Sequence, residues 1–239
     1  MRKIIQSCIF NGLELIKKNC SSMRTILVVN PKGGCGKSTI ATNLAGYYAS
    51  KGVSATLVDL DQQKSSYQWA MSRPDSVNAI ECVMDQQEEY QTKRVIFDCP
   101  AQIHIGRTTD LINKSDIIVM PINPSVIDHR AAFKFIFDVR GMIRADVCKS
   151  IQIGLVANRA NKAFTSYAEL EKFSTMMQTP VITSLRTSQN YVTAAQVGLS
   201  IFEMPQSRVM IDREQWKALT YWAEGKVLRK RTAAVPEAV

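Results

Sequence analysis

Short apolar runs recur along the chain from Arg24 onward, and each is apolar throughout instead of alternating with polar residues. Strands that are buried on both faces of a sheet show this continuous pattern, because neither side of the strand meets water. The pattern predicts six strands, at Thr25 to Asn30, Ala55 to Leu60, Val95 to Asp98, Asp116 to Ile122, Ile151 to Ala157 and Pro180 to Thr183.

Longer stretches with helical periodicity lie between these runs. They predict helices that include Lys37 to Lys51, Asp128 to Ile143, Ser166 to Met177 and Arg213 to Arg229. Strands that alternate with helices in this way are typical of βαβ units. We therefore expect a doubly wound α/β fold with a mostly parallel β-sheet flanked by helices on both faces.

Residues 1–22 precede the first predicted strand, and we interpret them as an extension to one domain that spans residues 23–239. Within the extension, Ile5, Ile9, Leu13 and Ile16 recur at helical spacing, which leaves an amphipathic membrane-surface helix open. The favoured alternative is a flexible tail, with Met23 as a plausible true start of the protein.

The charge balance is basic, with 30 Lys and Arg residues against 21 Asp and Glu residues and a net charge of +9. Such a balance favours a polyanionic partner, nucleic acid before an anionic membrane. The six cysteines are scattered without a CxxC pair, which indicates a reduced cytosolic protein without a structural metal. No apolar run approaches the roughly 18 residues of a membrane span.

A glycine-rich segment, Lys32 to Thr39 with the sequence KGGCGKST, stands between the first predicted strand and the first predicted helix. Glycines let a backbone wrap around phosphates, and a helix N-terminus adds partial positive charge. Lys37 would neutralise the outer phosphates, Ser38 would ligate Mg²⁺ and Thr39 would reach the α phosphate. The predicted nucleotide-binding loop comprises Gly33, Gly34, Cys35, Gly36, Lys37, Ser38 and Thr39.

Cys35 fills the variable position of this loop. A helix N-terminus beside lysines stabilises a thiolate, so redox control of nucleotide binding is open. The favoured alternative is a small side chain that this site tolerates.

Three aspartates lie at the ends of two of the predicted buried strands. Asp59 and Asp61 are two positions apart and so can point to one face, at the carboxyl edge where open α/β sheets bind ligands. Asp98 ends the next strand, a pattern in which the carboxylate holds Mg²⁺. For Asp59 the alternative is that it merely caps the following turn.

Lys32, which stands ahead of the paired glycines, makes the loop resemble the deviant Walker motif of the ParA/MinD family of P-loop ATPases. Within that family, the chain resembles the small ParF-like ParA proteins. That resemblance extends to Trp69 after Asp61, to Pro124 to Asp128, and to Asn158 with Arg159. Two positions depart from the family pattern, because Gln62 and Ala101 replace prolines.

The resemblance implies roles for these residues. Lys32 would reach the ATP of a partner subunit, and Asp61 would orient the attacking water. Asp59 would lie near the Mg²⁺ shell, which with Ser38 and Asp98 completes the predicted metal set. Asn158 and Arg159 would lie beside the adenine, and Pro124 and Asp128 at the interface of an ATP-dependent homodimer.

The family resemblance also implies a function. The dimer would bind nucleoid DNA without sequence preference, in the cytoplasm, and position a cargo whose ParB-like adaptor stimulates ATP hydrolysis. The cargo would be a plasmid or chromosome locus, or a protein body such as the carboxysome. The candidate DNA contacts are Arg186, Lys226, Arg229, Lys230 and Arg231, although cations at a helix end also occur simply as solvated residues.

Two other functions stay open. A MinD-like membrane switch needs an amphipathic segment, and residues 1–22 keep that possibility alive. A metabolic ATP-dependent ligase would need a substrate pocket that the sequence does not identify.

Overall fold

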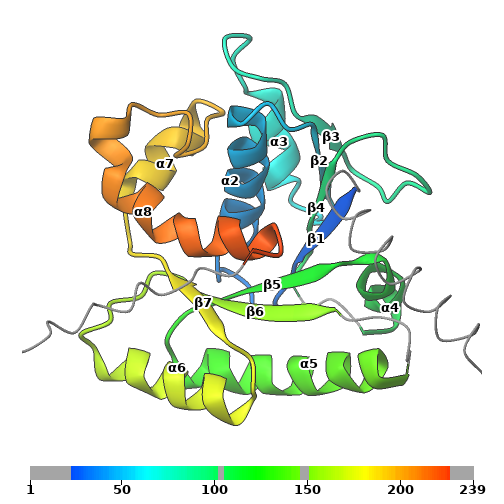
Figure 1. The fold of residues 1–239 in the computed structure, drawn as a ribbon, viewed down its shortest axis with the longest axis vertical. Coiled ribbons are helices and arrows are strands. Elements are labelled where there is room, and N and C mark those ends of the chain that lie inside the picture. The colour runs from blue at the N-terminus through cyan, green and yellow to red at the C-terminus, as the bar shows by residue number, and fades with distance from the viewer. Residues whose placement is uncertain (1–22, 102–104, 146–150, 227–239) are drawn as a thin grey trace, which may run out of the picture.

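A computed structural model describes residues 23–101, 105–145 and 151–226. The strands in these ranges form one sheet in the order β3-β2-β4-β1-β5-β6-β7, and each neighbouring pair is parallel (Figure 1). The strands are β1 Arg24–Val28, β2 Ala55–Asp59, β3 Glu81–Val83, β4 Arg94–Asp98, β5 Ile117–Ile122, β6 Gln152–Ala157 and β7 Val181–Ser184.

Helices cover both faces of the sheet (Figure 1). One face carries α2 Lys37–Ser50, α3 Ser65–Met71, α7 Gln189–Gln196 and α8 Gln206–Ala223, and the other carries α4 Ile105–Lys114, α5 Val126–Ala145 and α6 Thr165–Met176. Side chains of β1 alternate between the two layers: Ile26 packs with α2 and α8, whereas Leu27 packs with α4, α5 and α6. Burial of the sheet on both faces explains why its strands are continuously apolar.

The predicted doubly wound α/β fold is confirmed, and each of the six predicted strands is present within one or two residues of its predicted ends. The sequence did not reveal β3, α3, α4 or α7. β3 has three residues and lies at the edge of the sheet, where Glu81 is exposed, so it has no buried apolar run. α3 and α7 are only seven and eight residues long, too short for a clear helical period.

The prediction of a helix from Arg213 to Arg229 was wrong at both ends. α8 begins at Gln206, directly after Pro205, and ends at Ala223. Gly225 adopts a left-handed conformation with φ of +69°, and its amide donates to the carbonyl of Trp222, which terminates the helix. Lys226 therefore lies beyond the helix, and Arg229, Lys230 and Arg231 lie outside the described residues, as do residues 1–22.

Strand register sets the position of the candidate site. Asp98 of β4 lies opposite Asp59 of β2 on one side and opposite Val28 of β1 on the other. The glycine-rich loop follows β1, so the loop and two carboxylates meet at the carboxyl edge of the sheet. This edge is where open parallel sheets bind ligands.

Across the ranges that the structure describes, no helix combines the length and the apolar character that a membrane span requires.

Candidate functional site

The loop between β1 and α2 depends on glycine at Gly36. Its φ of +97° lies in the left-handed region that side chains disfavour. A Cβ at this position would stand 2.2 Å from Nδ2 of Asn158, whose amide donates to the carbonyl of Cys35 at 2.8 Å. The side chain of Asn158 thus fills the space beside Gly36. Gly34 also has a positive φ, of +73°, but a Cβ there would meet no heavy atom within 4 Å of the described chain.

Asn30, two residues after the end of β1, fixes the start of the loop through its side chain. The side chain is fully buried, donates from Nδ2 to the carbonyl of Pro121 at 2.5 Å and accepts at Oδ1 from the amide of Lys32 at 2.8 Å. Sequence reasoning assigned Asn30 to the end of a strand and missed this role. A polar amide that follows four buried strand residues was the available signal.

Two side chains of the loop turn back on its own backbone. Lys37 Nζ and Cys35 Sγ both donate to the carbonyl of Lys32, at 3.2 and 3.3 Å. Lys37 is buried, whereas Lys32, Gly33 and Gly34 are exposed. Lys32 is therefore accessible from solvent, whereas Lys37 is held at the base of the loop.

Cys35 is fully buried. Burial raises the pKa of its thiol, and the nearby Lys37 offsets this only in part. The thiolate that neighbouring lysines suggested is thus disfavoured. The structure supports the alternative of a small, buried side chain at this position.

One carboxylate oxygen of Asp98 is buried without a hydrogen-bond partner in the described part of the chain. Its Oδ2 accepts a hydrogen bond from Ser66 Oγ at 2.5 Å, but its buried Oδ1 has no partner among the described residues. Burial raises the pKa of Asp98 to about 6, and the hydrogen bond from Ser66 offsets this only in part. A buried carboxylate oxygen without a partner is costly unless a ligand or ion completes it. Ser66 was not predicted, because the motif at Asp98 does not reveal a hydroxyl 32 residues earlier.

Asp59 organises the segment that carries Asp61. Its two carboxylate oxygens accept from the backbone amides of Asp61 at 3.0 Å and of Tyr67 at 2.8 Å. Asp61 is only partly buried and accepts from the amide of Gln63 at 2.9 Å. Asp59 therefore caps the turn, as the alternative prediction had it, and its place near the Mg²⁺ shell stays a prediction.

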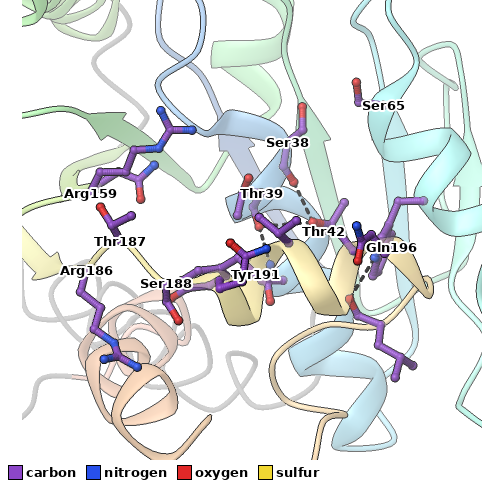
Figure 2. Close-up of a pocket in the computed structure, with 17 residues that line it drawn as sticks. Ser38, Thr39, Thr42, Ser65, Arg159, Arg186, Thr187, Ser188, Tyr191 and Gln196 are labelled. Carbon is purple, nitrogen blue, oxygen red and sulfur yellow. Dashed lines mark hydrogen bonds between the residues drawn. The ribbon is translucent and has the colours of Figure 1, made fainter. Parts of the chain in front are cut away.

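A cavity of about 840 Å³ opens beside the first turn of α2 (Figure 2). Ser38 and Thr39 line it on the side of the loop, Asn158 and Arg159 line it at the end of β6, and the segment from Arg186 to Gln189 lines it at the end of β7. Trp69 of α3 also contributes to the wall. The predicted pair Asn158 and Arg159 thus lies at a cavity continuous with the loop, where a base and sugar would adjoin phosphates.

Pro124 and Asp128 lie where β5 leads into α5. Ser125 Oγ donates to Asp128 Oδ2 at 2.7 Å and accepts from the amide of Asp128 at 3.2 Å. The second oxygen of Asp128 is buried and has no hydrogen bond to the described part of the chain. These bonds cap the start of α5, and the role of both residues in a dimer interface stays a prediction.

The predicted DNA contacts that lie within the described residues do not form one cluster. Arg186 lines the cavity and pairs with Asp212 of α8, with Nε 2.7 Å from Oδ1. Lys226 is exposed after the end of α8. The remaining three cations belong to residues 227–239, outside the described ranges.

These features fit a nucleoside polyphosphate with a divalent cation. Gly34 and Gly36 give a backbone cradle that a side chain would obstruct or strain, and Lys37 supplies a buried cation. Oxygen ligands suit Mg²⁺, and Asp98 offers an oxygen that no described residue satisfies. The chemistry of the loop, the carboxylate and the adjoining cavity is consistent with one bound nucleotide.

Comparison with known proteins identifies the same family. The family model described as CobQ/CobB/MinD/ParA nucleotide binding domain matches residues 26–201. The chain is 27% identical to "Maintenance of carboxysome distribution protein A" of Halothiobacillus neapolitanus over 191 residues, which cover 75% of this chain and 87% of that protein. It is 26% identical to the chromosome-partitioning ATPase Soj of Treponema pallidum over 218 residues, covering 85% and 80% of the two chains.

Solved structures share the fold. A variant of Cyanothece McdA in complex with ATP superposes with a TM-score of 0.67 at 15% identity, covering 87% of this chain and 99% of that one. A plasmid partition protein of Borrelia burgdorferi bound to AMPPNP gives a TM-score of 0.65 at 15% identity, with coverage of 84% and 100%. At 15% identity these structures show the fold alone. The family assignment rests on the family model, which matches most of the chain. The chain therefore belongs to the CobQ/CobB/MinD/ParA nucleotide-binding family, as one of its deviant Walker ATPases.

Proposed function

We propose that this ATPase is a nucleotide-dependent switch that dimerises around ATP, binds nucleoid DNA without sequence preference and positions a cargo in the cytoplasm. The observation that supports it most directly is the buried, unpartnered Oδ1 of Asp98 beside a glycine loop and a cavity that suit a nucleotide. The cargo would carry a ParB-like adaptor that stimulates hydrolysis.

In this proposal ATP and Mg²⁺ are held by residues already described. Lys37 binds the outer phosphates, and Ser38 and Asp98 hold the ion, with Asp59 beside them. The ion would neutralise charge on the phosphates during hydrolysis. Asp61, at the start of the turn that Asp59 caps, orients the attacking water. Asn158 and Arg159 border the base.

The dimer is proposed to form on the face that exposes the glycine loop. Lys32 is exposed there, so its cation is available to a partner's phosphates, where it would stabilise developing negative charge. Pro124 and Asp128 would lie at the same interface.

DNA binding is supported by the charge distribution around the cavity. Arg159 lines the cavity and is exposed, and the chain as a whole carries a net charge of +9. Arg186 contributes less than the sequence suggested, because its charge is paired with Asp212. Lys226, Arg229, Lys230 and Arg231 remain candidate contacts.

The cargo is proposed by analogy with relatives. One is named for the maintenance of carboxysome distribution and another for chromosome partitioning. A DNA locus and a protein body are therefore both candidates, and identification of the adaptor would separate them.

Binding of the full chain to non-specific duplex DNA tests the proposal, measured with ATP, with ADP and without nucleotide. We expect the chain to bind DNA in the presence of ATP, and we expect Lys37→Ala to abolish this binding. Lys51→Ala, at an exposed position at the far end of α2, is the control and should bind as the wild type does. If the dimer contacts about four phosphates, a plot of the logarithm of the binding constant against the logarithm of the salt concentration should have a slope of about −3.6.

The same measurement on anionic liposomes distinguishes the rival. Binding to liposomes but not to DNA would contradict the DNA proposal and support a MinD-like membrane switch. A chain restricted to residues 23–239 would then show whether residues 1–22 carry that binding. Stimulation of ATP hydrolysis by a small molecule, and not by DNA with an adaptor, would instead support a metabolic ligase.

A further inference from the structure

Asp212 of α8 is a fully buried carboxylate whose partners come from one distant segment. Arg186 donates from Nε to Oδ1 at 2.7 Å and from Nη2 to Oδ2 at 3.2 Å. Asn190 Nδ2 and Ser188 Oγ donate to Oδ2 at 2.6 and 3.3 Å. In residues 186–190, which we call the cavity wall segment, three side chains thus converge on one carboxylate of α8 that lies 22 to 26 residues away.

The cavity wall segment connects β7 to α7 and borders the cavity from Arg186 to Gln189 (Figure 2). Its backbone also reaches α8 through a side chain, because the amide of Arg186 donates to Gln215 Oε1 at 3.0 Å. Ser188 caps α7 by accepting from the amide of Asn190. The position of this wall therefore depends on side chains of α8.

A further contact lies one turn beyond Asp212 on α8. Trp216 Nε1 donates to the hydroxyl of Tyr191 at 2.8 Å, and Tyr191 lines the same cavity. Asp212 and Trp216 are four positions apart, so they lie on one face of the helix, and both are fully buried. α8 thus supports the cavity from behind without lining it.

The charge of Asp212 matters to this arrangement. Burial alone would raise the pKa of Asp212, but hydrogen bonds from Arg186 and Asn190 outweigh burial and hold it below the ordinary value. A buried carboxylate kept ionised needs its donors, and the donors are held in place by it in turn.

We propose that Asp212 is a positioning residue for nucleotide binding, which holds the cavity wall segment where the base and sugar of the nucleotide are bound. The inference rests on the proposed function, because it requires that the cavity receives the nucleoside part of ATP. Asp212 does not touch the nucleotide in this scheme, and it acts through Arg186 and Ser188. Its loss should weaken binding of the nucleoside part and leave binding of phosphates to the glycine loop intact.

The test compares two ligands that share the phosphates, ATP and inorganic tripolyphosphate, each with Mg²⁺, by calorimetry on the full chain. Asp212→Asn keeps the shape of the side chain but removes its charge. We expect the affinity for ATP to fall about tenfold, within the contribution typical of a charged hydrogen bond. The affinity for tripolyphosphate should change less than about twofold, well below a tenfold step of about 1.4 kcal/mol.

Glu214→Gln is the matched control, because Glu214 lies on the same helix, is exposed and forms an ion pair with Lys217. It makes the same chemical change and should leave both affinities as they are. Asn190→Ala is a second, milder variant. Asn190 donates to Asp212 but does not line the cavity, so its removal should lower the affinity for ATP selectively even if Asp212→Asn fails to fold.

The outcomes separate the two proposals. Unchanged ATP affinity in Asp212→Asn and Asn190→Ala would overturn the positioning role while leaving the proposed function intact. A parallel loss for ATP and tripolyphosphate would also overturn it, because that result indicates general destabilisation. If the wild-type chain binds ATP no more tightly than tripolyphosphate, both proposals are overturned.

Discussion

At the scale of single residues, the site depends on a few atoms whose surroundings are unusual. Gly36 has no room for a side chain, and one oxygen of Asp98 is buried without a partner among the described residues. Both features sit within the loop and strand ends that the proposed function assigns to phosphate and metal. They make the site sensitive to changes of one or two atoms.

Gly36→Ala should abolish nucleotide binding and destabilise the fold. The new methyl group meets Nδ2 of Asn158, and a left-handed conformation with a side chain costs of the order of 1–3 kcal/mol. Calorimetry with ATP and urea denaturation would measure the two effects.

Gly141→Ala serves as the control, since Gly141 is exposed on α5 and a Cβ there meets no described atom within 4 Å. It should raise the free energy of unfolding by about 1 kcal/mol, because alanine favours a helix. Equal affinities for ATP in the wild type and in Gly36→Ala would contradict this account of the loop.

Asp98 should give the metal-free protein a characteristic pH dependence. Burial raises its pKa to about 6, so between about pH 4 and pH 6 the folded chain binds more protons at this site than the unfolded chain. The free energy of unfolding should therefore decrease as the pH rises through this window, by about 2–3 kcal/mol at most.

Asp212 has the opposite effect on the pH dependence of the free energy of unfolding. Its pKa is lowered, so its stabilisation is lost as the pH falls below about 4.

Urea denaturation in the presence of a chelator, at several pH values, would measure the contribution of Asp98 as the difference between the wild type and Asp98→Asn. A difference between wild type and Asp98→Asn that does not vary between pH 4 and pH 6 would argue against the burial effect.

At the scale of elements, α3 joins the part of the site that carries Asp59 and Asp98 to the loop before α8. At one end, Ser66 donates to Asp98 and the amide of Tyr67 donates to Asp59. Near the other end, Trp69 Nε1 donates to the carbonyl of Leu199 at 3.1 Å, and Arg73, two residues beyond the helix, pairs with Glu203 at 2.6 Å. α3 is thus fixed at both ends although it has only seven residues.

The pair of Arg73 and Glu203 should be costly to break. Their side chains are only 6% and 5% exposed, so Arg73→Ala or Glu203→Ala alone leaves an unpaired buried charge, at a cost of about 3–5 kcal/mol. The double variant should cost less than the two single variants combined, because neither charge is then left alone.

Guanidinium denaturation of the two single variants and of the double variant checks this coupling. Lys217→Ala provides the comparison, since its pair with Glu214 is exposed and should contribute about 0–1 kcal/mol. Additive effects of Arg73→Ala and Glu203→Ala would show that the pair is not coupled.

At the scale of the whole molecule, the loops at the carboxyl edge leave Lys32 exposed while Lys37 is buried. This difference predicts distinct consequences for two lysines of one loop. Lys32→Ala should bind ATP as a monomer and fail to dimerise, whereas Lys37→Ala should bind neither ATP nor a partner.

Light scattering of the full chain with ATP, beside a measurement of ATP affinity, would separate the two variants. Lys51→Ala, at an exposed position after α2, should behave as the wild type. An ATP-dependent dimer of Lys32→Ala would show that Lys32 does not form the interface.

The sequence was sufficient to predict those features that depend on residues close together along the chain. The continuous apolar runs predicted six of the strands, and the spacing of glycines and lysines predicted the loop, because both patterns are local. Contacts between distant residues could not be predicted in this way. Asn158 with Cys35, Ser66 with Asp98, and Asp212 with Arg186 depend on how the strands and helices are brought together.

The positions of the tryptophans have a spectroscopic consequence. Trp69 lines the cavity with its indole nitrogen bonded to Leu199, whereas Trp216 is fully buried behind the wall and Trp222 borders a second cavity at the far end of β6. Emission from Trp69 is therefore sensitive to whatever occupies the cavity and to movement of α3. The unlabelled protein carries its own fluorescent reporter of the site.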